Sequence, residues 1–505
     1  MVLAIASTAS VALGLGGCRL REGQTFARPP VDIPAEYSAG AAMLADLEAG
    51  ERQTLTADRD ATMESWWRTF EDPDLDAAVE AALEANFDLR QAWSRLRQAA
   101  AAVVIAGSGR RPSIDGRAGA SVSRSGDRAA EIPFDGTPGN RWDESSNLGI
   151  SLAWELDVWG RIASRQDAAA LRAAATRAEA SDTALLIVAS VVDTWITVRE
   201  QRALLALLED QVATGRTLLE LTELRFGTGA ASSVGVLQQR GQVASTESAL
   251  PVARAQLAAA EHRLAVLLGV PPGTLTIEPE AGLPPLPPAP ATGTPADLLV
   301  YRPDLRAALL QLDAADHDVA EAVADRLPRI TLGLSYDFSG ASLGGVLDRE
   351  LGSIAANLIA PLADGGRRRA EVTRREAVVQ QRLDAFGQAM LLALQDVEDA
   401  LMRERHQREL LRRRAIQLEL AAATLRETRS RYAGGQSPYT DVVIAVQNLQ
   451  QLERQMLGER AALLRFRAEL HRSLGGRWME QLAPPPPRSL DPYVRAGDTD
   501  SETLP

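Results

Sequence analysis

The feature that most constrains this chain is an internal duplication. The stretch "FDLRQA" that starts at Phe87 returns as "PDLRAA" at Pro303, a shift of 216 positions. Further along, "RFGTG" at Arg225 returns as "RYAGG" at Arg431, a shift of 206 positions. A constant shift that drops once by ten indicates two repeats of one unit, with a loop ten residues shorter in the second. The fold must therefore be built from two similar halves.

Each repeat contains two segments in which apolar and polar residues alternate. They are about 112–123 and 146–157 in the first repeat, and about 328–339 and 352–362 in the second. A period of two is typical of strands with one apolar and one polar face. Roughly 9–11 residues are enough for a tilted strand to cross a bilayer. Two hairpins on a soluble core would show the same period, but Asp115, Arg117 and Glu155 on the polar faces favour a lipid-facing apolar side and a wet interior.

Four such strands cannot close a barrel by themselves. An open sheet edge in lipid leaves backbone N–H and C=O groups without partners, which is costly because no water can replace them. We therefore expect the barrel to be shared between subunits.

The rest of each repeat is predicted to be helical. The segments 161–226 and 367–432 contain no proline and little glycine. Some 66 residues at about 1.5 Å each make a helix roughly 100 Å long. Glycine-containing breaks at about 226–233 and 433–438 end these helices, and shorter helices then return. Each repeat therefore contains a long helical hairpin with a tip.

These patterns divide the chain into consecutive parts. The expected parts are a signal peptide at 1–17, a lipidated segment at 18–73, the first repeat at 74–270, a proline-rich linker at 271–302, the second repeat at 303–476 and a polar, proline-rich tail at 477–505.

The N-terminal segment predicts export and lipidation. It is uncharged as far as "LGGC", which ends in Cys18, the only cysteine of the chain. This sequence resembles the lipobox of bacterial lipoproteins, in which the cysteine receives a diacylglycerol and an N-acyl chain; the alternative is a small apolar cysteine in a core helix. The next residue is Arg19 and not aspartate, so the usual signal for retention at the inner membrane is missing. We expect no cofactor other than this covalent lipid.

Composition argues against two classes of protein. The net charge is −13, and the basic cluster at 367–369 has Glu371 close by, whereas a nucleic-acid-binding protein concentrates positive charge on one face. The four histidines are scattered, with no HExxH pair and no cysteine partners. We therefore expect neither nucleic-acid binding nor an enzyme, and no metal site.

Several motifs recur in one order along the chain. They are "WWRTFEDPDLDAAVEAAL", "WELDVWGRIASRQDAA", "YRPDLRAALLQLDAADHDVA", "LADGGRRRAEV" and "RYAGGQSPYTDVV". In this order and spacing, from about Glu64 to Trp478, the chain resembles the TolC-like outer-membrane efflux channels. Together with the lipobox, the motifs resemble in particular the lipoprotein branch that includes OprM and the NodT-type proteins.

The resemblance implies a fold and a set of partners. The fold is a mixed α and β membrane protein, a homotrimer whose twelve strands form one outer-membrane barrel continued by a long periplasmic barrel of coiled helices. The function is that of a passive duct in a tripartite efflux pump, which exports small molecules such as drugs and toxic compounds. The implied partners are an inner-membrane transporter of the proton-driven RND type, which supplies the energy, and a periplasmic adaptor, through which it acts.

The resemblance also gives a role to the helical tips. In the family the tips line the closed periplasmic mouth and contact the adaptor. This role maps onto Arg225, Gly227, Gly229, Ser232, Arg431, Gly434, Gly435 and Ser437. Glycines at these positions are also expected from ordinary helix termination, and the two roles are compatible.

The gate is expected in the second tip. Some relatives carry two aspartates there; this chain has Asp441, but the residue three positions on is Ile444. In the first tip, Gly235 stands where such relatives place an aspartate that binds the tyrosine equivalent to Tyr432. We therefore expect Ile444 to form an apolar plug. The alternative is that Asp441 only caps the returning helix.

Two other functions remain open. A TolC-type channel for protein secretion would have the same fold and a different cargo. A lipid-anchored coiled-coil scaffold of the envelope would explain Cys18 and the helices, but not four strands of membrane length.

Overall fold

The computed structural model describes most of the chain. The described residues are 26, 28–40, 43, 65–126, 140–275 and 282–485. They fall into two compact units. Of the described residues, the first unit contains those up to Pro30 and those within 97–175 and 308–386, and it holds the sheet. The second unit contains those within 31–96, 176–307 and 387–485.

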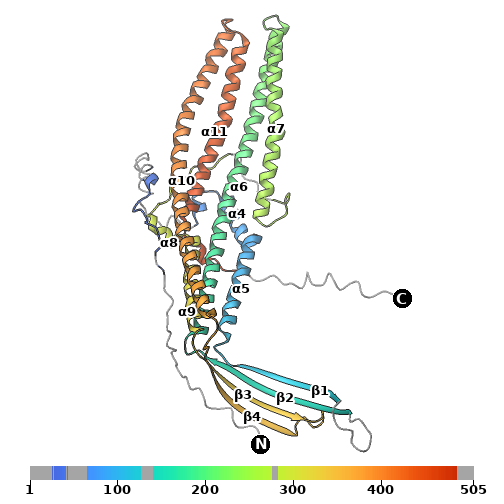
Figure 1. Ribbon diagram of the computed structural model, residues 1–505. Coiled ribbons are helices and arrows are strands. Elements are labelled where there is room, and N and C mark those ends of the chain that lie inside the picture. The colour runs from blue at the N-terminus through green and yellow to red at the C-terminus, as the bar shows by residue number, and fades with distance from the viewer. Residues whose placement is uncertain are drawn as a thin grey trace, which may run out of the picture. The chain divides into compact units, whose positions relative to one another are not determined.

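The order of elements in the first repeat recurs in the second (Figure 1). Helix α5 (Phe87–Ser108) corresponds to α9 (Pro303–Ala324), with both ends shifted by 216 residues. Helix α6 (Arg161–Gly227) corresponds to α10 (Arg367–Ala433), with both ends shifted by 206. The two shifts read from the motifs therefore also describe the secondary structure.

Helices α7 (Ser233–Leu267) and α11 (Tyr439–Leu474) complete the two hairpins. The described residues also include helices α4 (Pro73–Ala85) and α8 (Leu298–Tyr301), and the short 3-10 helices η1 (Trp66–Phe70), η2 (Pro295–Asp297) and η3 (Trp478–Gln481).

The four strands form one antiparallel sheet in the order β1-β2-β3-β4 (Figure 1). They are β1 (Ser113–Gly126), β2 (Asn140–Leu156), β3 (Arg329–Gly340) and β4 (Arg349–Ile359). Several bounds differ from those expected, since β1 ends at Gly126 rather than near 123 and β4 begins at Arg349 rather than near 352. β2 begins at Asn140 rather than near 146, because its backbone pairs with β1 as far as Gly126, beyond the apolar alternation. β4 ends at Ile359 rather than 362, because its partner strand begins at Arg329.

The two faces of the sheet differ as the alternation predicts. Ile114, Leu152, Leu334 and Ile354 lie opposite one another across the four strands and form an apolar row. Ile114 is 64% exposed and Ile354 87%. A face of this kind is suited to lipid or to another apolar surface.

The polar face carries an ion pair that spans three strands. Arg117 Nη2 lies 2.7 Å from Asp337 Oδ1, and Gly149 is paired with both residues on the strand between them. A Cβ atom at position 149 would collide with the Asp337 carboxylate, so the ion pair requires glycine there.

The long helices are held by small and branched side chains. Among the described helices, α6 alone is apolar and long enough to cross a membrane by composition, but 61% of its apolar window is buried inside the protein. Val188, Val192 and Trp195 on α6 pack in a core with Trp66 and Leu75. This apolar stretch is therefore a packing surface within the second unit.

Two buried ion pairs lie in the second unit. Asp72 accepts from two backbone N–H groups at the start of α4 and binds Trp195 Nε1 and Arg199 Nη1, each at 2.9 Å. Arg467 Nε lies 3.0 Å from Glu404 Oε2, with both side chains 0% exposed, and the guanidinium also donates to the Pro287 carbonyl. The "WWRTFEDPDL" motif thus supplies both core aromatics and the Asp72 cap.

Candidate functional site

The two tips turn with the same backbone geometry. Gly229 and Gly435 have φ of +76° and +70°, the left-handed region that glycine adopts without strain. The N–H of Ala230 donates to the Arg225 carbonyl at 2.8 Å, and Gln436 N–H donates to Arg431 at 2.8 Å. These glycines therefore end α6 and α10 in the manner of a C-terminal cap.

The returning helices start differently. Ser232 Oγ accepts from Gly235 N at 3.2 Å and caps α7. The N-cap of α11 is Pro438, without a side-chain cap bond. Asp441 lies in the first turn of α11, so it does not act as the N-cap; its carboxylate there still interacts favourably with the helix dipole.

Asp441 and Ile444 lie on one exposed side of α11. Both are exposed, and Ile444 is 58% exposed, whereas Val442 and Val443 between them are buried. A spacing of three residues places the first pair about one turn apart on the same face. The two predicted gate residues therefore point away from the core of their own subunit.

Tyr432 makes an aromatic contact instead of a polar lock. Its ring centroid lies 5.1 Å from that of Tyr439, and the Arg225 guanidinium carbon lies 4.7 Å from the Tyr432 centroid. The second distance is that of a cation–π interaction. Gly235 lies beside Tyr439, because a Cβ at position 235 would be 3.3 Å from Tyr439 Cδ1.

Tyr439 also joins the two hairpins by a hydrogen bond that sequence reasoning missed. Its hydroxyl donates to Gln239 Oε1 of α7 at 2.9 Å. Burial raises the pKa of Tyr439, so the hydroxyl stays protonated and able to donate. No spacing or period marked Gln239, because its partner lies 200 residues away in the sequence.

Below the tips, α7 and α11 are joined by glutamine side chains. Gln447 donates to Gln242 at 2.6 Å, and Gln242 donates to Gln450 at 3.0 Å. Gln211 of α6 reaches the Gln450 carbonyl at 3.3 Å. Uncharged amides thus make part of the joint between the hairpins, and Arg454 of α11 adds a charged donor by binding Gln211 at 2.7 Å.

Of the predicted tip residues, Arg225, Gly227 and Arg431 lie in the last turns of α6 and α10. The loops hold Gly229, Ser232, Gly434, Gly435 and Ser437. A cavity of about 210 Å³ between the tips is lined in part by Ser232, Gly235, Tyr432 and Tyr439. Arg431 pairs with Glu427 at 2.8 Å on the surface, where such a pair contributes little to stability. Cys18 lies outside the described residues.

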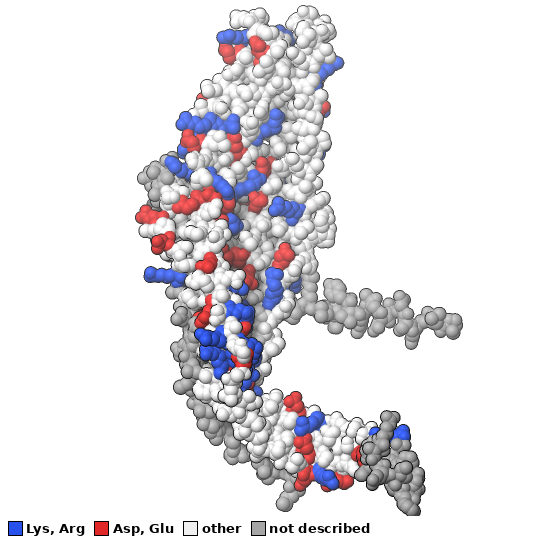
Figure 2. Space-filling model, viewed as in Figure 1, with Lys and Arg blue, Asp and Glu red and all other residues white. Residues whose placement is uncertain are grey.

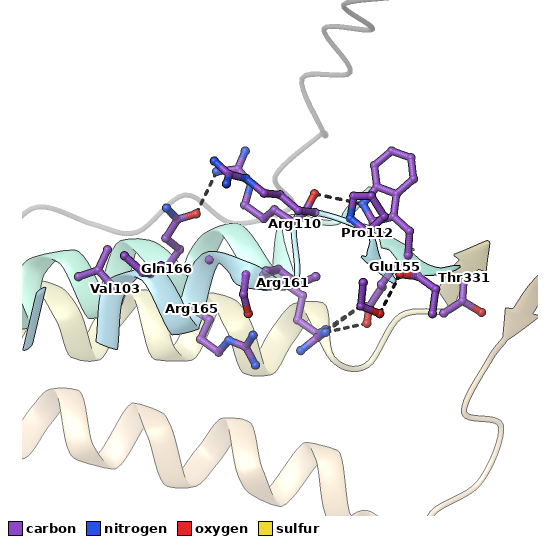
Figure 3. A pocket seen from close by; sticks show the side chains of 17 residues that line it. Val103, Arg110, Pro112, Glu155, Arg161, Arg165, Gln166 and Thr331 are labelled. Carbon is purple, nitrogen blue, oxygen red and sulfur yellow. Dashed lines mark hydrogen bonds and ion pairs between the residues drawn. The ribbon is translucent and has the colours of Figure 1, made fainter. Parts of the chain in front are cut away.

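A larger cavity, of about 1080 Å³, lies in the first unit where the sheet meets α5 and α6 (Figure 3). Arg161 Nη2 lies 2.9 Å from Glu155 Oε2 in its wall. Trp154 Nε1 donates to the Arg110 carbonyl at 3.1 Å, and Arg110 Nη1 donates to Gln166 at 3.2 Å. These contacts tie the end of β2 to α6 and to Arg110, which follows α5.

Charge is distributed without a dominant sign on the face seen in Figure 2, where basic and acidic residues are intermixed. Local pairs contribute to this, such as Arg412 with Glu409 and Arg375 with Glu371. Over the described residues, no group of three or more His, Cys, Asp or Glu is placed to hold a metal ion.

Comparison with known proteins agrees with this geometry. The family described as outer membrane efflux protein matches residues 78–270 and 294–476. The pyoverdine export outer membrane protein OpmQ of Pseudomonas aeruginosa is 30% identical over 431 residues, covering 82% of this chain and 87% of that protein. The solvent efflux pump outer membrane protein SrpC of Pseudomonas putida is 27% identical over 471 residues, which cover 92% of this chain and 97% of that protein.

A solved structure of the outer-membrane channel OprN has the same fold. It superposes with a TM-score of 0.79 at 27% identity, covering 90% of this chain and 99% of that one. The relatives are channel proteins and not enzymes. With the family match extending over both repeats, the chain belongs to the outer membrane efflux protein family.

Proposed function

We propose that this chain is the outer-membrane channel subunit of a tripartite efflux pump, a passive trimeric duct for small molecules. The observation that carries the proposal is the continuity of strand and helix in both repeats. β2 ends at Leu156 and α6 begins at Arg161, while β4 ends at Ile359 and α10 begins at Arg367. Strands long enough to cross a bilayer thus lead within a few residues into helices of 67 residues.

The sheet is the membrane-spanning part. Its apolar face, with Ile114 and Ile354 exposed, meets lipid, and its polar face, with Arg117 and Asp337, lines the interior. Because β1 and β4 each have an edge without a partner strand among the residues that the structure describes, subunits must combine to close a barrel in lipid. Three subunits give twelve strands, an even number within the range known for such barrels.

The helices form the periplasmic part. The protein resides in the bacterial outer membrane and extends into the periplasm. A helix of 67 residues is about 100 Å long. The hairpins α6–α7 and α10–α11 of three subunits enclose the continuation of the duct, and the glutamine contacts between α7 and α11 keep the two hairpins of a subunit together.

The tips contact the rest of the pump. The adaptor binds the tips of the two hairpins, at Arg225, Gly227, Gly229, Ser232, Arg431, Gly434, Gly435 and Ser437. An inner-membrane transporter, of the proton-driven RND type, supplies the energy through this adaptor. The name of SrpC as part of a solvent efflux pump supports a pump of several components.

The closed mouth is narrowed by the second tip. Asp441 and Ile444 share an exposed side of α11, and three subunits bring three copies of each toward one axis. Ile444 excludes water from the narrow ring, and Asp441 gives the mouth a negative potential. Tyr432 holds this tip through its contacts with Tyr439 and Arg225.

Cys18 anchors the N-terminus through its diacylglycerol and N-acyl chain, since two or more acyl chains suffice for stable membrane attachment. Cys18→Ser should abolish incorporation of labelled palmitate and leave unprocessed precursor. Unchanged labelling would contradict the lipid anchor.

The cargo is a small molecule. OpmQ is named for pyoverdine export and SrpC for solvent efflux, and both cover most of this chain. Deletion of the gene should increase sensitivity to members of a panel of dyes, detergents, antibiotics, solvents and metals, and expression from a plasmid should restore resistance. Unchanged sensitivity together with the loss of a secreted protein would instead indicate a secretion channel. Extraction of the protein by carbonate or urea without detergent would indicate a scaffold.

A further inference from the structure

The sheet has two edges that no strand of the described residues covers. In the order β1-β2-β3-β4, β1 and β4 are the outer strands, and every residue of β4 is exposed. Leu362, three residues beyond the end of β4, is 95% exposed. On the proposed function, in which subunits close a barrel, these edges must pair with each other between neighbouring subunits.

The internal duplication gives a rule for strand register that can be checked within one chain. In the first repeat Ser113 pairs with Ala153. Shifting Ser113 by 216 residues and Ala153 by 206 gives Arg329 and Ile359. The structure pairs these two residues in the second repeat. The register of the β3–β4 hairpin therefore follows from that of the β1–β2 hairpin and the two shifts.

The same rule applies to the junction between repeats. Within the sheet, β2 is the last strand of the first repeat and β3 is the first strand of the second repeat. Leu156 of β2 pairs with Ile330 of β3 across this junction. The corresponding junction joins β4 to β1 of the next subunit. Shifting Leu156 forward by 206 residues gives Leu362, and shifting Ile330 back by 216 gives Ile114. We infer that Leu362 of one subunit pairs with Ile114 of the partner subunit.

The alternation of the two strands agrees with this register. Continuing along the ladder, Leu358 lies opposite Ala118 of the partner subunit and Ile354 opposite Val122 of the partner subunit, all on the apolar face. The residues between them bring Asn357 opposite Gly119 of the partner subunit on the polar face. A slip of one residue would place apolar side chains of one strand opposite polar ones of the other.

Pairing of β4 with β1 of the next subunit accounts for two features of the single chain. β4 stops at Ile359, whereas its counterpart β2 runs to Leu156, the position equivalent to Leu362. Pairing with the next subunit extends β4 toward Leu362, although Pro361 can donate no hydrogen bond there. The pairing also gives the Leu362 side chain, 95% exposed in the single chain, an apolar neighbour in Ile114 of the partner subunit, which is 64% exposed.

The junction between subunits differs from the junction within one. Trp159 Nε1 donates to the Pro328 carbonyl at 2.7 Å where β2 meets β3. The equivalent positions between subunits are Gly365 and Pro112 of the partner subunit, so no indole bond forms there. Pro112 and Ser113 line the cavity of about 1080 Å³ at the foot of β1. Figure 3 shows Pro112 in its wall, so the proposed register brings the neighbouring subunit to this cavity.

Disulfide formation between engineered cysteines tests the register. In outer membranes of cells that express the full-length protein, Ile114→Cys combined with Leu362→Cys should give covalent dimers and trimers after oxidation by copper phenanthroline. Because Cys18 is the only native cysteine, each single variant serves as a background control. The matched control combines Ile114→Cys with Leu358→Cys, which the register separates by four residues, roughly 13 Å.

The outcomes separate the register from the proposed function. Cross-linked trimers from the first pair and none from the shifted pair support the register. Cross-linking of the shifted pair alone overturns it. A trimer by mass in mild detergent that neither pair cross-links also overturns the register but leaves the proposed duct intact. A well-behaved monomer overturns the trimeric duct itself.

Discussion

The two helical tips share a backbone and differ in their side chains. Both turn through a glycine in the left-handed region and are closed by the same backbone hydrogen bond. The Ala230 N–H donates to the Arg225 carbonyl in one tip, and the Gln436 N–H donates to the Arg431 carbonyl in the other. Where the first tip has Gly235 and Gln238, the second, shifted by 206 residues, has Asp441 and Ile444.

The duplication has thus kept the turn geometry while the side chains diverged. A charge and an exposed apolar side chain stand on one side of the second tip, and the corresponding positions of the first tip carry neither. Two repeats that keep the same geometry allow each residue of one to serve as a control for its counterpart in the other.

The largest difference between repeats is a buried ion pair. Arg467 and Glu404 are fully buried in the second repeat, and the equivalent positions of the first are Glu261 and Val198. Glu261 instead forms a partly exposed pair with Arg202 at 2.8 Å. Glu404→Gln leaves the Arg467 charge buried without its partner, so it should lower the free energy of unfolding by about 3–5 kcal/mol.

The matched variant Glu261→Gln should cost less than about 1 kcal/mol, because water screens that pair. The thermal midpoint of the helical circular-dichroism signal in mild detergent measures both. Equal losses in the two variants would mean that the repeats do not differ in their dependence on these pairs.

The next difference is a half-buried carboxyl of the first repeat. Burial, followed by the nearby Asp304 carboxylate, raises the pKa of Asp182 to about 6, and its counterpart in the second repeat is Gln388. The pKa of an unfolded aspartate is about 3.9. The unfolded state therefore binds fewer protons between these values, and the free energy of unfolding falls as pH rises through this range.

Asp182→Asn should accordingly stabilise the protein above about pH 7 by up to about 3 kcal/mol and have little effect near pH 4. Gln388→Asn should show no such pH dependence. The thermal midpoints of both variants at about pH 4 and about pH 7 measure this effect. If Asp182→Asn raises the midpoint equally at the two pH values, the Asp182 carboxyl is not the titrating group.

The sequence predicted the regular elements of both repeats well. The period-two alternation located the strands, and the absence of proline located α6 and α10 almost to the residue. The sequence did not predict the side-chain contacts between the two repeats. Tyr439 binds Gln239, and Gln447 binds Gln242, only because α7 and α11 pack with one particular rotation. Helical periodicity identifies a face but not the residue opposite it.

The gate is the third difference. If the second tip narrows the duct, Ile444→Ala should raise single-channel conductance or open probability in planar bilayers, because a smaller side chain widens an apolar constriction. Asp441→Asn should reduce cation selectivity, because it removes negative charge from the mouth. The control is Gln238→Ala, at the position of the first tip equivalent to Ile444. If that control has the same effect as Ile444→Ala, the constriction is not a property of the second tip.

The smallest difference is the capping of the returning helices. Ser232 Oγ accepts from Gly235 N at 3.2 Å at the start of α7, while Pro438 makes no such bond at the start of α11. Ser232→Ala should cost about 1 kcal/mol. The loss should stay local, because Val236 and Gln239 of α7 are buried and hold the helix beyond its first turn.

Hydrogen exchange at the Gly235 amide should therefore speed up about fivefold in Ser232→Ala, the factor that corresponds to 1 kcal/mol, while amides deeper in α7 stay protected. Pro438→Ala removes no cap bond, so the first turn of α11 should keep its exchange rate. Both variants leave the glycine turns at 229 and 435 unchanged, so they report on the first turn of each returning helix. Faster exchange along the whole of α7 would mean that Ser232 holds the hairpin and not only its first turn, and unchanged exchange at Gly235 would remove capping from the differences between the tips.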